Sequence, residues 1–132
     1  MNRNYVALVL GSKTRFDPEI VSNFLEIKAT RVWHRKPDLV VFGEDRVSQV
    51  EWILEETFDE SVLIGDAIAI FFQNHSFQND RLIKISEELE LSVSIVARVF
   101  SDEVENSLDL SPELAGKIHR IGANLLYTCG PS

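Results

Sequence analysis

The sequence contains little of the chemistry on which most catalytic and metal sites depend. Its single cysteine, Cys129, rules out a disulfide within the chain and is typical of a protein kept in a reducing compartment. Cys129 follows a predicted terminal strand and lacks the local signature of a catalytic nucleophile. The three histidines lie far apart, with no paired ligand spacing; they are His34, His75 and His119. We therefore expect no metal and no cofactor.

The patterns of glycine and of carboxylates exclude two further kinds of site. The six glycines occur singly, so no glycine-rich loop is available to bind a phosphate group. Adjacent carboxylates such as Glu55 and Glu56 point to different sides of a strand or helix, so they do not form a general acid–base pair. The sequence therefore predicts a protein that is not an enzyme.

Long apolar runs are also missing. The longest uncharged apolar run, residues 67–72, is far too short to cross a bilayer. Residues 1–4 lead into a short apolar run without the cleavage pattern of a signal peptide, so we expect a cytoplasmic protein that does not enter a membrane. With 132 residues, of which 45% are apolar, the chain is expected to form a single domain over residues 1–132.

Positive charge is scarce, and just over half of it lies near the N-terminus. Thirteen basic and twenty-one acidic side chains give a net charge of −8, divided into +4 over residues 1–36 and −12 over residues 37–132. An acidic surface repels phosphate backbones, which argues against nucleic-acid binding, and it speeds the capture of a basic partner. The alternative is that the charge only keeps the protein in solution.

The most regular feature of the sequence is a repeated segment, because residues 17–33 are echoed without a gap by residues 111–127. The copies begin with Asp17-Pro18-Glu19 and Ser111-Pro112-Glu113, and apolar residues then occupy the same places in both. An N-cap residue followed by proline predicts the start of a helix, and the later residues of each copy favour a strand. The repeat is architectural and carries no chemistry.

Apolar periodicity predicts the remaining elements. Strands are expected at residues 5–10, 29–34 and 92–100, and helices from residues 17, 59, 80 and 111, with a break at residues 74–79. Residues 50–57 favour a strand, although a helix also fits, and residues 39–42 could form a short strand. The order β-α-β-β-α(α)-β-α-β predicts an α+β fold. We expect a ferredoxin-like (split βαβ), mostly antiparallel sheet with helices on one face, extended by a C-terminal helix and strand.

One aromatic residue is a candidate for binding. Trp33 ends a predicted strand, and Arg35 follows closely. A tryptophan beside cations can stack on a ligand or anchor a partner, so Trp33 and Arg35 form a candidate pocket. The alternative is a tryptophan that closes the end of the sheet at the rim of the core.

Several of these segments resemble the bacterial family called domain of unknown function 4279, over roughly residues 5–128. The segments that carry the resemblance are Asp17-Pro18-Glu19-Ile20, residues 29–33, Trp52-Ile53-Leu54, residues 110–114 and residues 121–127. The chain departs from the family pattern at Ala29, where proline is usual, at Pro37-Asp38, where glycine-aspartate is expected, and in a longer segment at residues 71–79. The family has no established activity, so the resemblance implies no catalytic residues. It does suggest an immunity protein, since small cytoplasmic bacterial domains of this kind include proteins that neutralise polymorphic toxins.

These observations favour a non-enzymatic domain that binds a basic protein, most concretely a nuclease toxin domain. The residues that we expect at its interface are acidic and lie in a predicted loop and at a predicted helix end: Asp102, Glu103, Glu105, Glu87, Glu88 and Glu90. The competing hypothesis is a small-molecule-binding regulatory domain, or an enzyme of unrecognised type, with a pocket near Trp33. A third hypothesis is a subunit that self-associates through an open sheet edge. No pattern in the sequence specifies an oligomeric state.

Overall fold

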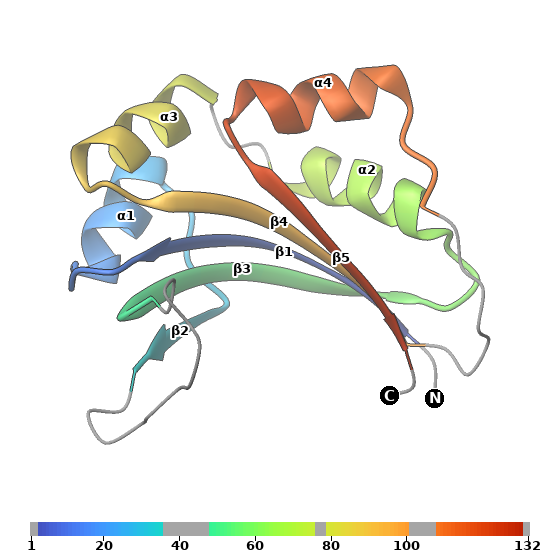
Figure 1. Cartoon of the computed structure of the whole chain (residues 1–132), viewed down its shortest axis with the longest axis horizontal. Helices are drawn as coiled ribbons and strands as arrows, with labels where there is room; N and C mark the ends of the chain where they lie inside the picture. The colour runs from blue at the N-terminus through green and yellow to red at the C-terminus, as the bar shows by residue number, and fades with distance from the viewer. Residues whose placement is uncertain (1–2, 36–47, 76–78, 101–107, 131–132) are drawn as a thin grey trace.

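The elements follow the predicted order and form an α+β fold in which helices cover one face of a sheet (Figure 1). The computed structural model describes residues 3–35, 48–75, 79–100 and 108–130. In chain order the elements are β1 (Arg3–Ser12), α1 (Pro18–Leu25), β2 (Arg31–His34), β3 (Val50–Asp59), α2 (Ile64–Asn74), α3 (Asn79–Glu88), β4 (Ser92–Phe100), α4 (Pro112–Arg120) and β5 (Asn124–Gly130). The prediction of a strand rather than a helix at residues 50–57 is confirmed. The strand considered at residues 39–42 lies outside the described residues.

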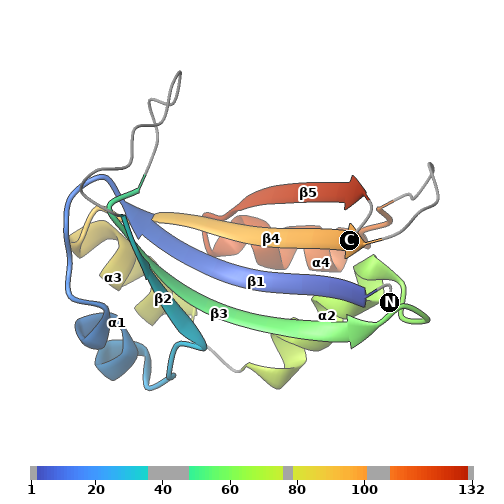
Figure 2. The same ribbon diagram turned by 90° about the horizontal axis from the view of Figure 1, so that it is seen from below.

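The sheet is mixed, with the strand order β2-β3-β1-β4-β5 (Figure 2). The central strand β1 pairs antiparallel with both β3 and β4, and β2 pairs antiparallel with β3. At the other edge β5 runs parallel to β4, because α4 carries the chain back along the sheet before β5 begins. The expectation of a mostly antiparallel sheet was therefore wrong, since a helical crossover joins the last two strands.

The core lies between the helices and one face of the sheet, which we call the inner face. Side chains alternate between the two faces of a strand, and the register places Leu8 of β1 between Leu54 of β3 and Ile95 of β4. All three are buried, and they join one core cluster with apolar residues from every helix. Trp52 is fully buried in this layer, and its Nε1 donates a hydrogen bond to Ser22 Oγ of α1 at 2.9 Å. This bond fixes α1 on the sheet.

The two predicted helix caps are confirmed. Asp17 Oδ1 accepts a hydrogen bond from the backbone N–H of Glu19 at 3.0 Å, and Ser111 Oγ accepts one from Leu114 at 3.1 Å. In each helix the proline follows its cap, where its missing N–H costs no hydrogen bond. Helices α1 and α3 lie over one end of the sheet, and α2 and α4 over the other (Figures 1 and 2).

Two element boundaries differ from the expectation. Helical structure was predicted from Asp59, but Asp59 ends β3, and its Oδ1 accepts a hydrogen bond from the Ser61 N–H at 2.9 Å. This local turn separates the strand from α2, which begins at Ile64. At the C-terminus β5 extends to Gly130, so Cys129 lies within the strand rather than after it, paired with Val99.

Candidate functional site

The candidate site lies on the outer face of the sheet, the face opposite the helices, which is viewed in Figure 2. The register arranges its side chains in four rows that cross the strands. The rows are Trp33–Glu51–Gly11–Ser92, then Arg31–Ile53–Val9–Ser94–Asn124, then Glu55–Ala7–Val96–Leu126, and last Thr57–Tyr5–Arg98–Thr128. The two middle rows have an apolar centre, and charged or polar residues lie around it. In the part of the chain that the structure describes, no helix packs on this face.

A three-residue polar network closes one side of this face. Tyr5 Oη donates a hydrogen bond to Glu55 Oε2 at 2.5 Å, and Arg31 Nε lies 3.1 Å from both oxygens of the same carboxylate. Burial raises the pKa of Tyr5, and its contact with Glu55 raises it further. The contacts with Tyr5 and Glu55 raise the pKa of Arg31. The Glu55 charge is therefore matched within the fold, and the network joins β1, β2 and β3.

A second arginine lies on the same face at the β4–β5 pair. Arg98 Nε donates a hydrogen bond to Thr128 Oγ1 at 3.2 Å, and its guanidinium carbon lies 5.9 Å from the centroid of the Phe100 ring. Between Arg31 and Arg98 the face forms a cavity of about 320 Å³ whose floor includes the apolar residues Val9 and Val96. Both arginines thus line this hollow and are already partly engaged by their neighbours.

Glu51 is a charged residue of the outer face with no hydrogen bond or ion pair to the described part of the chain. Its side chain is half-buried. Burial raises the pKa of Glu51, while the charge of Arg31 lowers it to a smaller extent. A carboxylate in this state is disfavoured in its ionised form.

Glu51 also lines a larger cavity, of about 820 Å³, at one end of the sheet. Its lining is partly polar and partly apolar and comes from the end of β1, the starts of β3, β4 and β5 and the loops beside them: Gly11, Ser12, Lys13, Thr14, Ser48, Glu51, Glu90, Ser92, Ser94, Asn124, Leu125 and Leu126. Glu51, Ser94 and Leu126 line both cavities, so the two hollows adjoin. The arrangement offers hydroxyl groups and carboxylates beside apolar side chains.

Comparison with protein families identifies the chain. The family model described as Domain of unknown function (DUF4279) matches residues 2–128, which is nearly the whole length. The chain belongs to the DUF4279 family. Comparison with curated proteins and with solved structures found no match. The predicted resemblance is thus confirmed, and the function of this DUF4279 member must be argued from its own geometry.

The predicted partner-binding residues of this DUF4279 domain fall in three places. Asp102, Glu103 and Glu105 lie outside the described residues. Glu87 and Glu88 are exposed at the end of α3, away from the cavities described above. Glu90, which follows α3 with a left-handed φ of 53°, lines the larger cavity together with Glu51. The structure therefore brings one of the predicted acidic residues to the candidate site.

The candidate pocket at Trp33 and Arg35 is adjacent to the site without lining the cavities described here. Trp33 is half-buried and pairs with Glu51 between β2 and β3, so it belongs to the outer face. The backbone N–H of Arg35 donates to Gln49 O at 2.9 Å and continues this pairing. Whether the two residues bind a ligand stays a prediction.

The two adjacent glutamates of β3 point to opposite faces, as their alternation predicts. Glu55 joins Tyr5 and Arg31 on the outer face. Glu56 lies on the inner face, where Asn74 Nδ2 lies 2.9 Å and His75 Nε2 3.1 Å from its carboxylate oxygens at the end of α2. Neither carboxylate is available to assist the other in proton transfer.

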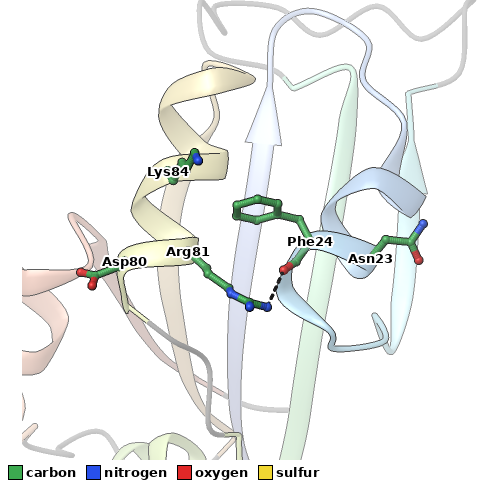
Figure 3. Close-up of a pocket in the computed structure, with 5 residues that line it drawn as sticks. All are labelled: Asn23, Phe24, Asp80, Arg81 and Lys84. Carbon is green, nitrogen blue, oxygen red and sulfur yellow. Dashed lines mark hydrogen bonds between the residues drawn. The ribbon is translucent and has the colours of Figure 1, made fainter.

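A separate hollow of about 480 Å³ lies between α1 and α3 (Figure 3). Arg81 points across it, with Nη1 3.4 Å from the Phe24 carbonyl oxygen and 3.2 Å from Glu26 Oε2, while Lys84 Nζ lies 6.0 Å from the centroid of the Phe24 ring. Asp80 and Asn23 point away from this contact. Because Arg81 and Lys84 of α3 contact Phe24 and Glu26 at the end of α1, these side chains join the two helices across the hollow.

Two further features of the described residues bear on function. They contain no cluster of three or more histidine, cysteine, aspartate or glutamate side chains placed to hold a metal ion. No helix within them has the length and apolar character needed to cross a membrane.

Proposed function

We propose that this DUF4279 domain is a non-enzymatic protein-binding domain whose partner contacts the outer face of the sheet. The observation that carries the proposal is the arrangement of that face, with an apolar centre ringed by polar and charged groups. Protein interfaces have this anatomy of an apolar core and a polar rim. Leu126 ends the third row, on the edge strand β5, and exposes 52% of its surface, which makes it an apolar residue that a partner can cover.

The partner that we propose is a basic protein, because the chain carries a net charge of −8. An acidic surface accelerates the capture of a basic partner and repels competing acidic proteins. Nuclease domains of polymorphic toxins are basic because their substrates are polyanions. The proposal in its most specific form is therefore an immunity protein that masks such a toxin in the cytoplasm of the bacterium that makes it.

We also infer that the first four strands form a ferredoxin-like, split βαβ unit, to which α4 and β5 are added. The order β2-β3-β1-β4 and its antiparallel pairings support this inference. In such a unit the helices lie on one face of the sheet, which leaves the other face for recognition.

The test uses two exposed leucines in different parts of the molecule. Leu126→Arg places a charge on the outer face at its edge strand β5, and Leu63→Arg places one at the start of α2, where Leu63 exposes 72% of its surface. The candidate partner is the toxin-like domain encoded next to this gene, and its binding is measured by surface-based kinetics. The proposal expects binding to be lost in Leu126→Arg and retained in Leu63→Arg. Equal binding by both variants would place the interface elsewhere.

Salt dependence tests the electrostatic part of the proposal. The association rate should fall steeply between low and physiological salt, because screening shortens the reach of exposed charges to about 8 Å. The dissociation rate should change much less, since it reports short-range contacts. Replacing Glu103 and Glu105 by lysine should slow association in the same way. An association rate indifferent to both changes would mean that the acidity serves only solubility.

A second candidate function is the binding of a small molecule in the larger cavity. The observation that favours it is the set of hydroxyl groups in the lining of that cavity, where Ser12 Oγ lies 3.0 Å from Thr14 Oγ1 and Ser92 Oγ lies 3.2 Å from the Gly11 carbonyl oxygen. A thermal-shift screen of metabolites discriminates between the two functions. A ligand at about 100 times its dissociation constant adds roughly 2.7 kcal/mol, which raises the melting temperature measurably.

A further inference from the structure

We propose that Glu51, together with Trp33, receives one arginine side chain of the protein partner. The inference rests on the proposed function and names the group that the outer face recognises. The geometry behind it is a half-buried carboxylate that opens into both adjoining cavities and has no hydrogen bond or ion pair among the described residues. A buried or half-buried charge is retained at a binding surface when a partner supplies the opposite charge.

The other charged residues in the four rows of the outer face are already engaged. Glu55 is bound by Tyr5 and Arg31, and Arg98 is held by Thr128 and the Phe100 ring. Burial raises the pKa of Glu51, while the charge of Arg31 lowers it to a smaller extent. Of the two glutamates that β3 places on the outer face, Glu51 is therefore the one to which an incoming cation can bind without breaking a pair between described residues.

The backbone next to Glu51 is built for a close approach. A Cβ atom placed on Gly11 would lie 2.6 Å from Ser48 Oγ and 3.4 Å from Glu51 Cγ, so only glycine leaves this space. Gly11 pairs directly with Glu51 between β1 and β3. Because Gly11 has no side chain, the Glu51 side chain can lie against β1. For the same reason, no side chain projects from β1 at this position of the first row.

The surroundings favour a cation, and among cations an arginine. Trp33 pairs with Glu51 on the side away from Gly11, so an indole and a carboxylate stand next to each other in the same row. Guanidinium groups bind carboxylates with two hydrogen bonds and stack on aromatic rings, which an ammonium group does less well. The charged residues that line the larger cavity are Glu51, Glu90 and Lys13, which leaves an excess of negative charge there.

The experiment titrates the isotopically labelled protein with a capped glycine-arginine-glycine peptide and follows the indole N–H signals by NMR. A glycine-citrulline-glycine peptide is the control, because citrulline has the same shape without the charge. Trp52 is fully buried on the inner face and serves as an internal reference for Trp33. We expect a saturable shift of the Trp33 signal with the arginine peptide alone, while the Trp52 signal does not move.

Two variants assign the interaction to Glu51. Glu51→Gln should lower the affinity for the arginine peptide by about tenfold or more, since a charge-assisted pair is replaced by a neutral contact. Glu60→Gln, at an exposed turn, should leave the titration unchanged. Equal shifts with the citrulline peptide, or an unchanged titration in a folded Glu51→Gln variant, would overturn the inference.

The same variants separate this inference from the proposed function. If Leu126→Arg abolishes partner binding while Glu51→Gln affects neither the partner nor the peptide, the outer face is the interface and the arginine site is wrong. If the arginine peptide binds through Glu51 while Leu126→Arg binds the partner as well as the wild type does, the arginine site exists and the proposed function is wrong. A loss in Glu51→Gln of both partner and peptide supports both.

Discussion

The two faces of the sheet are made by the same strands but carry different kinds of residue. In β4 the inner-face residues Val93, Ile95, Ala97 and Val99 are all buried and apolar, whereas the outer-face residues Ser92, Ser94, Val96 and Arg98 are polar or only partly buried. The inner face holds the helices, and the outer face holds the cavities and the charged network. The comparison indicates that in β4 the buried apolar contacts are concentrated on the inner face, while the outer face carries the polar groups.

Adjacent residues of β4 provide the sharpest test of this separation, and the largest expected effect. Ile95→Ala removes a fully buried inner-face side chain and should lower the free energy of unfolding by about 2–5 kcal/mol. Val96→Ala removes a partly buried outer-face side chain and should cost about 1 kcal/mol or less. Urea denaturation at neutral pH measures both. Similar costs at the two positions would show that the outer face is also part of the core.

Two glycines extend the comparison to close backbone approaches. A Cβ atom on Gly65 of α2 would lie 2.1 Å from the Asp109 carbonyl oxygen, so Gly65→Ala requires the backbone to move and should cost about 1–3 kcal/mol. On the outer face the nearest atom to a Cβ on Gly11 is Ser48 Oγ, a side-chain atom that can rotate away. Gly11→Ala should therefore cost less than Gly65→Ala in the same denaturation experiment. The reverse order would contradict the expectation that the backbone neighbour of Gly65 yields less easily than the side-chain neighbour of Gly11.

The two N-caps give a smaller effect that is confined to the helices. Asp17→Ala and Ser111→Ala each remove a hydrogen-bond acceptor and should each cost about 0.5–2 kcal/mol. Neither residue lies on the outer face, so binding of the arginine peptide and of the partner should be unchanged while the protein is folded. A variant that kept its melting temperature but lost binding would show that the cap segment takes part in recognition.

Local signals in the sequence predicted the elements well, and long-range pairing explains what they missed. Two kinds of feature depend only on neighbours in the chain and could be predicted from the sequence. They are the helix caps at Asp17 and Ser111 and the alternation in residues 92–100. The parallel direction of β5 was not, because it depends on the path of α4 across the sheet. Helical periodicity also hid the turn at Asp59, where a side-chain hydrogen bond ends the strand.

The candidate site was harder to predict for the same reason. Glu51 in the sequence is one of many glutamates that alternate with apolar residues, which is typical of a strand with one solvated face. Its importance depends on the strands beside it, since Trp33 and Gly11 flank it only through the register of β2 and β1. The sequence pointed to Trp33 and Glu90 separately, and only the fold shows that Trp33 pairs with Glu51 and that Glu90 lines the same cavity as Glu51.

The smallest expected effect is a pH dependence that distinguishes Glu51 from the rest of the outer face. Because burial raises its pKa, the folded state holds the Glu51 proton more tightly than the unfolded chain does. The stabilisation from protonated Glu51 is fully present below the unfolded pKa and is lost as the pH rises through the folded pKa.

The wild type should therefore lose stability relative to Glu51→Gln between acid and neutral pH. Glu60→Gln is the control: it keeps Glu51, so the titration of Glu51 contributes nothing to the difference in stability between this variant and the wild type. Urea denaturation of the three proteins at several pH values measures the differences, in which other titrating groups cancel. A wild type that gains stability over Glu51→Gln as the pH rises would mean that the Glu51 carboxylate already has a favourable partner within the fold.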